Sequence, residues 1–158
     1  MSADPEALLD ELAGCDPDLN LERYWGERSL FYNPNGERPL GIIWVSVKDH
    51  DGANDRSSNL DRDGVHRLSF QLSREAYERR FGPRPARPPK GGVVDIPRYD
   101  PTRLDQLLPH PVYAWMSWAM ILSPSRAALR SLRAPMLESL DAVRARGRGR
   151  KGSATTAR

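Results

Sequence analysis

The residues best placed for chemistry lie in the segment 107–118, which reads Leu-Leu-Pro-His-Pro-Val-Tyr-Ala-Trp-Met-Ser-Trp. It contains one of the chain's three histidines, held between Pro109 and Pro111. The two prolines restrict the backbone and hold the segment extended. A histidine fixed in this way can donate a hydrogen bond to a ligand or act as an acid or base near neutral pH. It can also hydrogen-bond the backbone and fix a corner of the fold, and the sequence leaves both roles for His110 open.

Three aromatic residues follow this histidine: Tyr113, Trp115 and Trp118. They could line a pocket beside His110. Aromatic residues at nearly alternating positions of a strand can equally form one packed face of a sheet. The sequence therefore identifies an aromatic, rigid segment without deciding between a binding surface and a packed one.

The segment 65–72 alternates between apolar and polar side chains and is typical of a half-buried strand. His66 falls on its apolar face, where we interpret it as a satisfied core histidine. Arg67 falls on the opposite face, where its guanidinium could pair with an anion. The candidate binding residues are therefore His66, Arg67, His110, Tyr113 and Trp118.

No catalytic, metal or cofactor motif stands out. The stretches 49–52 and 61–64 are rich in Asp and Gly, but a calcium loop counted from Asp49 would need a glycine sixth and a glutamate twelfth. Those positions hold Asn54 and Leu60, so we interpret both stretches as solvated turns. The histidines and the single cysteine lack a zinc-site spacing. The glycines at 91–92 precede a short strand rather than the helix that a phosphate-binding loop requires.

The hydrophobic pattern predicts an α+β fold. Helices are expected from Asp4-Pro5 to Gly14, over 73–81, over 100–108, and from 124 onward with a kink or break at Pro135. Strands are expected over 19–25, 29–32, 40–47, 65–72 and 113–122. We expect one domain in which an antiparallel sheet of about four to six strands is covered by the N- and C-terminal helices.

Charge divides the chain unevenly. Its net charge is +3, yet the residues from Arg144 onward include five Arg, one Lys and no acid. We therefore expect a mildly acidic domain over 1–145, with a Pro/Gly-rich surface loop at 83–92, and a disordered basic tail over 146–158. No apolar run is long enough to span a membrane, and the lack of a leader sequence favours a cytoplasmic protein. Cys15 is the only cysteine, which excludes an intrachain disulfide.

A wider pattern covers nearly all of residues 20–143. It includes Phe31-Tyr32-x-Pro34, Lys48-Asp49, Ser58-Asn59-Leu60-Asp61-Arg62, Gly64-Val65-x-Arg67-Leu68, Phe81-Gly82, Leu108-Pro109-His110-Pro111-Val112-Tyr113, Trp118 and Pro124. In these positions the chain resembles an uncharacterised family of small proteins, mostly actinobacterial, known as a domain of unknown function. The order of elements is also similar to the small α+β proteins of the YjbR/MmcQ type, a resemblance that implies DNA binding through a double-wing arrangement.

These observations support three hypotheses. The first is a non-enzymatic domain that binds a small molecule or a protein partner around His110, Tyr113 and the 48–64 loop. The second is a nucleic-acid-associated protein, in which the basic tail makes weak, salt-dependent contacts with phosphates. The third is an enzyme that uses His66 or His110 as an acid or base, which would require a nearby carboxylate such as Asp95, Asp100 or Asp105.

Overall fold

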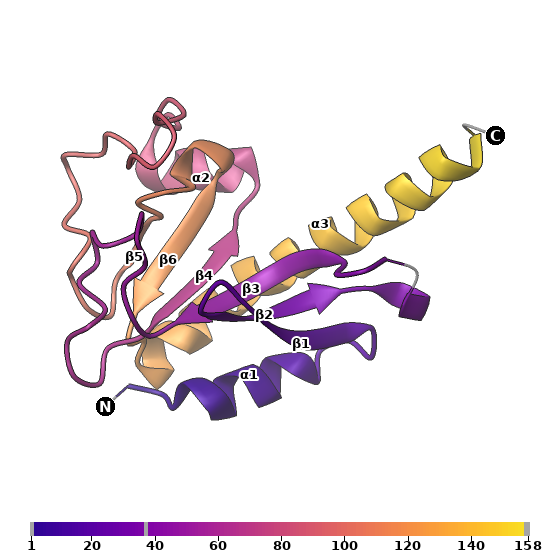
Figure 1. The fold of residues 1–158 in the computed structure, drawn as a ribbon, viewed down its shortest axis with the longest axis horizontal. Helices are drawn as coiled ribbons and strands as arrows, with labels where there is room; N and C mark the ends of the chain where they lie inside the picture. Colours follow the sequence, from indigo (N-terminus) through magenta and orange to yellow (C-terminus); the bar gives the residue numbers. More distant parts are fainter. Residues whose placement is uncertain (1, 37, 157–158) are drawn as a thin grey trace.

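Six antiparallel strands form one open sheet in the order β1-β2-β3-β4-β6-β5 (Figure 1). The computed structural model describes residues 2–36 and 38–156, with side chains described as far as residue 148. The strands are β1 (Leu19–Tyr24), β2 (Glu27–Tyr32), β3 (Ile42–Lys48), β4 (Arg67–Gln71), β5 (Leu107–Pro109) and β6 (Trp118–Leu122). The predicted α+β class and antiparallel sheet are confirmed.

Three α-helices and two short 3-10 turns complete the fold. They are α1 (Pro5–Ala13), α2 (Arg74–Phe81), α3 (Arg126–Thr156), η1 (Pro34–Gly36) and η2 (Ala114–Met116). Asp4 begins α1 as predicted, because its carboxylate accepts a hydrogen bond from the Ala7 N–H at 2.9 Å. Ser73 begins α2 in the same way. These caps satisfy N–H groups that have no partner within the helix.

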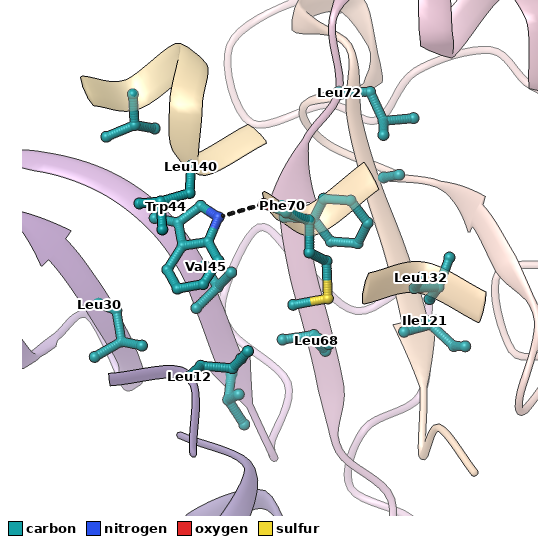
Figure 2. Close-up of a cluster of buried hydrophobic side chains, with 14 of the residues drawn as sticks. Leu12, Leu30, Trp44, Val45, Leu68, Phe70, Leu72, Ile121, Leu132 and Leu140 are labelled. Carbon is teal, nitrogen blue, oxygen red and sulfur yellow. Dashed lines mark hydrogen bonds between the residues drawn. The ribbon is translucent and has the colours of Figure 1, made fainter. Parts of the chain in front are cut away.

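Helices α1 and α3 cover the same face of the sheet and enclose the main core. Apolar residues of α1, such as Leu12, pack with Trp44 and Val45 of β3 and with Leu140 of α3 (Figure 2). The buried indole of Trp44 donates a hydrogen bond to the Met136 carbonyl at 3.0 Å. This bond ties the central strand β3 to α3, so the helix layer has a fixed position on the sheet.

The opposite face of the sheet carries polar side chains and is covered in part by the loop that joins β3 to β4. Leu60 of this loop packs with residues of β5 and β6 in a second, smaller apolar cluster. The long polar segment at 48–64 is therefore a packed part of the domain, and it positions several side chains of the site described below.

Two predicted elements are wrong. No helix forms over 100–108, because Leu107 and Leu108 pair with β6 and Leu108 is buried there. No continuous strand forms over 113–122 either. The antiparallel pairing of β5 with β6 requires the chain to reverse between them, and η2 followed by Ser117 at φ 71° makes that reversal.

Helix α3 continues through Pro135, so the predicted break is wrong, while the predicted kink stays a prediction. A proline inside a helix costs about 3 kcal/mol. Burial of Leu132 and Met136 on either side of Pro135 stabilises the helix against this cost. The backbone of α3 extends to Thr156, into the segment expected to be a disordered tail. The side chains from 149 onward and residues 157–158 lie outside the described residues, so the character of the tail stays a prediction.

Within the described residues, every helix is too short or too polar to cross a lipid bilayer.

Candidate functional site

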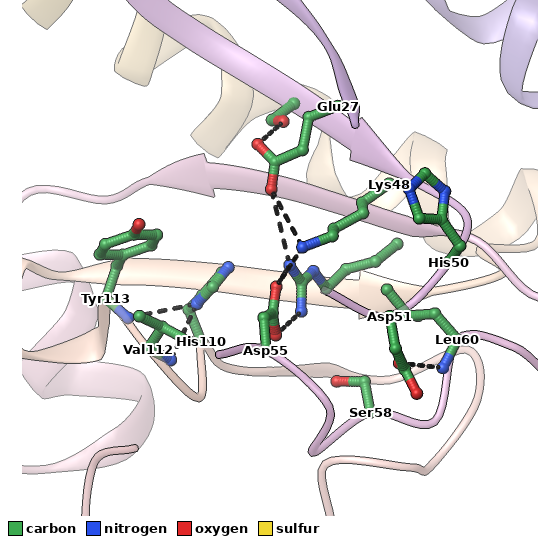
Figure 3. A network of polar contacts seen from close by, with 12 residues as sticks. Glu27, Lys48, His50, Asp51, Asp55, Ser58, Leu60, His110, Val112 and Tyr113 are labelled. Carbon is green, nitrogen blue, oxygen red and sulfur yellow. Dashed lines mark hydrogen bonds and ion pairs between the residues drawn. The ribbon is translucent and has the colours of Figure 1, made fainter. Parts of the chain in front are cut away.

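The polar face of the sheet brings together a network of charged side chains from four parts of the chain. The polar network consists of Glu27 on β2, Ser46 and Lys48 on β3, Asp55 in the β3–β4 loop and Arg67 on β4 (Figure 3). Strand alternation explains the placement, since Ser46 and Lys48 point away from the helices while Val45 and Val47 join the core.

Arg67 lies at the centre of the network and is only 1% exposed. Its two terminal nitrogens donate to both oxygens of Asp55, at 2.9 and 2.5 Å. This paired geometry is the strongest arrangement between a guanidinium and a carboxylate. The remaining Nε–H of Arg67 is buried and has no hydrogen-bond partner among the described residues. Arg67 therefore holds its anion within the protein itself and keeps one donor unused.

Lys48 and Glu27 extend the network. The Lys48 ammonium lies 2.9 Å from Asp55, and Glu27 lies 4.0 Å from Lys48 and 3.8 Å from Arg67. Ser46 donates to the second carboxylate oxygen of Glu27 at 2.7 Å. Two cations and two anions thus balance, which is what burial of charges requires.

The neighbouring cations lower the pKa of Asp55. Burial alone would raise the pKa, but the hydrogen bonds and charge of Arg67, together with the hydrogen bond from Lys48, outweigh burial. The pKa of Asp55 therefore lies well below its ordinary value. Asp55 is an anion throughout the physiological range and serves as a fixed charge rather than as a proton donor.

Hydrogen bonds within the β3–β4 loop fix the position of Asp55. Gly52 and Asp55 exchange backbone hydrogen bonds at 3.1 and 3.3 Å across a tight turn. The Asp51 carboxylate accepts from the Leu60 N–H, and the Asp61 carboxylate accepts from the Asp51 N–H. Two of the acidic residues that resembled metal ligands in the sequence, Asp51 and Asp61, thus bind backbone N–H groups. No cluster of His, Cys, Asp or Glu suited to a metal ion occurs in the described part of the chain.

His110 lies beside the network with its ring between Tyr113 and the charged groups (Figure 3). Its Nδ1 accepts hydrogen bonds from the backbone N–H groups of Val112 and Tyr113, at 3.1 and 3.2 Å. A nitrogen that accepts two N–H donors carries no proton, so the proton of the neutral ring is on Nε2. The imidazole closes the turn after β5 and presents Nε2–H as a donor.

Burial lowers the pKa of His110 well below 6.5, and the positive charge of Arg67 lowers it further. The ring therefore stays neutral at physiological pH. A group with so low a pKa is a weak base, which disfavours a role in proton transfer. His110 thus fixes the corner of the fold through its Nδ1.

Exposed aromatic side chains lie next to this polar centre, with Tyr113 beside His110 and Tyr24 opposite Glu27. The aromatic rim consists of Tyr24 at the end of β1, Trp25 in the turn between β1 and β2, and Tyr113, with exposed fractions of 42%, 85% and 45%. Glu27 of the polar network is the cross-strand partner of Tyr24, so the network and this part of the rim lie side by side. Burial of Tyr113 is the main cause that raises the pKa of its hydroxyl, and the negative charge of Glu27 raises this pKa further. The polar network, His110 and the aromatic rim together are called the polar sheet face below.

Trp25 adopts a conformation that is rare for its residue type. Its φ is 53°, and Gly26 follows at φ 75°, so the two residues form the tight turn of a hairpin. Asn or Asp would fill such a position with less strain than a bulky side chain. The turn holds a tryptophan almost fully in solvent, at a cost in both backbone strain and exposed apolar area.

The predicted site residues fall into two groups. Arg67, His110, Tyr113 and Trp118 lie together, with the Tyr113 and Trp118 rings 6.5 Å apart. His66 lies on the helix-covered face, as its alternation predicts. It is buried, but its Nε2 has no hydrogen-bond partner among the described residues, contrary to the expectation of a satisfied core histidine.

The sequence placed the 48–64 loop, which contains Lys48 and Asp55, at the candidate surface, but it did not single out Glu27, Lys48, Asp55 or Trp25 as site residues. A signal existed for Lys48, which is one of three lysines in the chain and continues the apolar 40–47 run at an outward position. Asp55 had no signal, because its partner lies twelve residues away across a loop of unknown path. Trp25 was interpreted as the end of a strand rather than as the tip of a turn.

Two cavities of the described residues lie away from the polar sheet face. One lies between α1 and α3 and is described below, while the other lies beside Gln71, Pro135 and Arg146. The polar sheet face is therefore an open surface, with His110 closed beneath Tyr113, rather than the wall of either cavity.

Comparison with known proteins supports only the predicted resemblance to a family of unknown function. No curated protein and no solved structure matches the chain. The match to a family covers residues 3–152, which is nearly the whole described chain. The chain therefore belongs to DUF6194, a family of unknown function.

Proposed function

We propose that this chain is a non-enzymatic binding domain that recognises a protein partner through the polar sheet face. The observation that carries the proposal is the aromatic rim, above all Trp25, which is 85% exposed at a strained turn beside a fixed polar centre. Exposed tryptophan and tyrosine are the side chains that most often dominate protein interfaces. Their strain and exposure are costs that a bound partner would offset.

The polar centre suits recognition better than catalysis. Asp55, Lys48 and Arg67 already satisfy one another, and the low pKa of His110 makes the ring a poor base. The three carboxylates considered in the sequence, Asp95, Asp100 and Asp105, form no hydrogen bond with either buried histidine. A pre-ordered set of charges costs little entropy on binding and favours one partner orientation.

The shape of the surface favours a protein over a small molecule. Trp25 projects from the tip of a hairpin and is convex, so it fits a pocket on a partner rather than enclosing a ligand itself. Small-molecule sites are concave and bury most of their ligand. The cavity between α1 and α3 and the cavity beside Gln71 lie elsewhere on the molecule.

Site-specific photo-crosslinking tests the proposal. A photo-reactive amino acid is placed at position 25 of the full chain and, as a matched control, at position 104. Leu104 is a large apolar residue that is 46% exposed beyond β5, at the other edge of the sheet. We expect position 25, but not position 104, to capture a defined protein from the native cell lysate, and we expect Tyr113→Ala to abolish that capture. Equal capture at both positions, or capture that survives Tyr113→Ala, would refute the proposal.

The nucleic-acid hypothesis rests on the basic tail and stays a prediction. The implied relationship to YjbR/MmcQ-type proteins and an actinobacterial origin also stay predictions. The polar network is electrically balanced and offers no excess positive charge to a phosphate backbone.

A further inference from the structure

A cleft of about 250 Å³ lies between α1 and α3, on the face of the molecule opposite the polar sheet face. Its floor is apolar and includes Leu8 of α1, Trp44 of β3 and Met136 of α3. Trp44 is the same indole that ties the sheet to α3 (Figure 2). The volume lies just below the range of roughly 300–1,000 Å³ typical of drug-sized ligand sites, so it suits a slender ligand.

Three arginines line the α3 side of this cleft: Arg126, Arg130 and Arg133. Their spacing of four and three residues places them on one side of the helix. None of their guanidinium groups forms a hydrogen bond or ion pair with any residue for which the structure describes a side chain. Some arginines elsewhere in the domain are paired, as Arg144 is with Asp16 at 2.7 Å. Three unused guanidinium groups along one wall form a concentrated positive field.

The α1 side of the cleft contributes two carboxylates against the three arginines, so the lining keeps a net charge of 3 − 2 = +1. Asp4 lines it, but its carboxylate already accepts the hydrogen bond that begins α1. Glu11 is the other acidic residue on this wall, and it forms no ion pair with the arginines across the cleft. The cleft therefore combines an apolar floor with a net positive rim, a combination that recognises a ligand with an apolar chain and an anionic end.

We infer that this cleft binds a single-chain amphiphilic anion of the fatty-acid class, with the acyl chain over Trp44 and Met136 and the carboxylate among the α3 arginines. The guanidinium fork matches a carboxylate in geometry and keeps its charge at every physiological pH. The inference is independent of the proposed function, because the cleft and the polar sheet face share no residue.

Calorimetric titration of the full chain with decanoate, below its micelle concentration, tests the inference. We expect saturable binding that weakens about tenfold or more in the double variant Arg130→Glu and Arg133→Glu, since both substitutions reverse a charge at the rim. Arg80→Gln on α2 is the matched control, because Arg80 is also exposed and helical but lies outside the cleft. Its affinity should equal that of the unmodified chain.

Three further measurements make the test decisive. Ala7→Phe fills the cleft from an exposed position of α1 and should abolish binding while α1 still folds. Decanol, which has the same chain without the charge, should bind about tenfold more weakly than decanoate. Absence of decanoate binding, or equal binding by decanol, would overturn the inference. So would binding to phosphatidylglycerol vesicles without binding to free decanoate, because the occupant would then be a membrane surface.

Discussion

At the scale of single residues, the polar network depends on one buried pair. Arg67 and Asp55 join β4 to the β3–β4 loop through two hydrogen bonds, and Lys48 approaches the same carboxylate. A buried ion pair is weak evidence for net stability, because desolvation opposes attraction. Removal of one partner is different, since it leaves the other charge buried and unpaired.

Asp55→Asn should therefore destabilise the protein by about 3–5 kcal/mol at neutral pH. Asp63→Asn is the control, because Asp63 is exposed in the same loop and should change the stability by less than about 0.5 kcal/mol. Urea unfolding measures both. A loss for Asp55→Asn as small as that of the control would show that the pair does not hold the loop.

The pH dependence of this variant follows from the low pKa of Asp55. The folded pKa lies below the unfolded value of 3.8, so the carboxylate stabilises the fold above that pH. As the pH falls below 3.8, the unfolded state takes up a proton first and the stabilisation decreases. The difference in unfolding free energy between the unmodified chain and Asp55→Asn should therefore shrink in acid. A difference that grows in acid would contradict the charge assignment.

His110 gives a second prediction at this scale. Its folded pKa lies well below 6.5, so its contribution to stability is complete above pH 6.5 and is lost as the pH falls toward the folded pKa. Nitrogen NMR should show a neutral ring with the proton on Nε2 at about pH 6. His110→Gln should flatten the fall in stability below pH 6.5. A charged imidazolium at about pH 6 would contradict the assignment and reopen an acid–base role.

At the scale of elements, the join between the sheet and α3 runs through Trp44. Trp44→Phe removes the indole donor to the Met136 carbonyl and leaves a small void in the core. The expected loss is about 1–3 kcal/mol in the free energy of unfolding. Trp25→Phe makes the same chemical change at an exposed turn and should cost less than about 0.5 kcal/mol. Equal losses in the two variants would show that Trp44 does not anchor the helix.

Local sequence signals are sufficient to predict an element where the periodicity of its apolar residues agrees with its packing in the fold. The first helix, its Asp4 cap and the alternation of 65–72 could be predicted because burial follows the local pattern. Segment 100–108 carries a helix-start signal, and Asp100 does accept hydrogen bonds from Thr102. Pairing of Leu107 and Leu108 with β6 overrides that signal, and such a distant partner cannot be read from local residues.

The candidate site also contains residues that local sequence signals identify and residues that they miss. His110 and Tyr113 were identified because the prolines and aromatics stand together in the chain. Asp55 and Glu27 meet Arg67 only after the sheet has formed and the β3–β4 loop has folded over it. The order of the strands in the sheet and the path of the loop determine such contacts. Neither can be predicted from the spacing of residues in the sequence.

At the scale of the whole molecule, charge is separated along the chain. The residues 149–158 carry three cationic side chains and no acid, which equals the net charge of the entire chain. A chain that ends at residue 148 should lose weak binding to duplex DNA at low salt, and the full chain should lose it as salt rises. Fluorescence anisotropy measures this. Equal, salt-resistant binding by both chains would place a nucleic-acid surface on the domain instead.

The two faces of the molecule present different chemistry. One face carries the balanced polar network with its aromatic rim, and the other carries the cleft between α1 and α3 with its arginine wall. The sheet separates them, so substitutions on one face should leave binding at the other unchanged. This separation lets the two proposals be tested in the same protein without interference.

The most direct test of the central claim is the affinity of the partner captured at position 25, titrated against the purified full chain. Trp25→Ala removes the most exposed aromatic residue of the rim, while Leu104→Ala removes a comparable apolar surface at the far edge of the sheet. The account predicts that Trp25→Ala weakens binding about tenfold or more and that Leu104→Ala leaves it unchanged. Equal affinity for Trp25→Ala and the unmodified chain would contradict the assignment of the polar sheet face as the recognition surface.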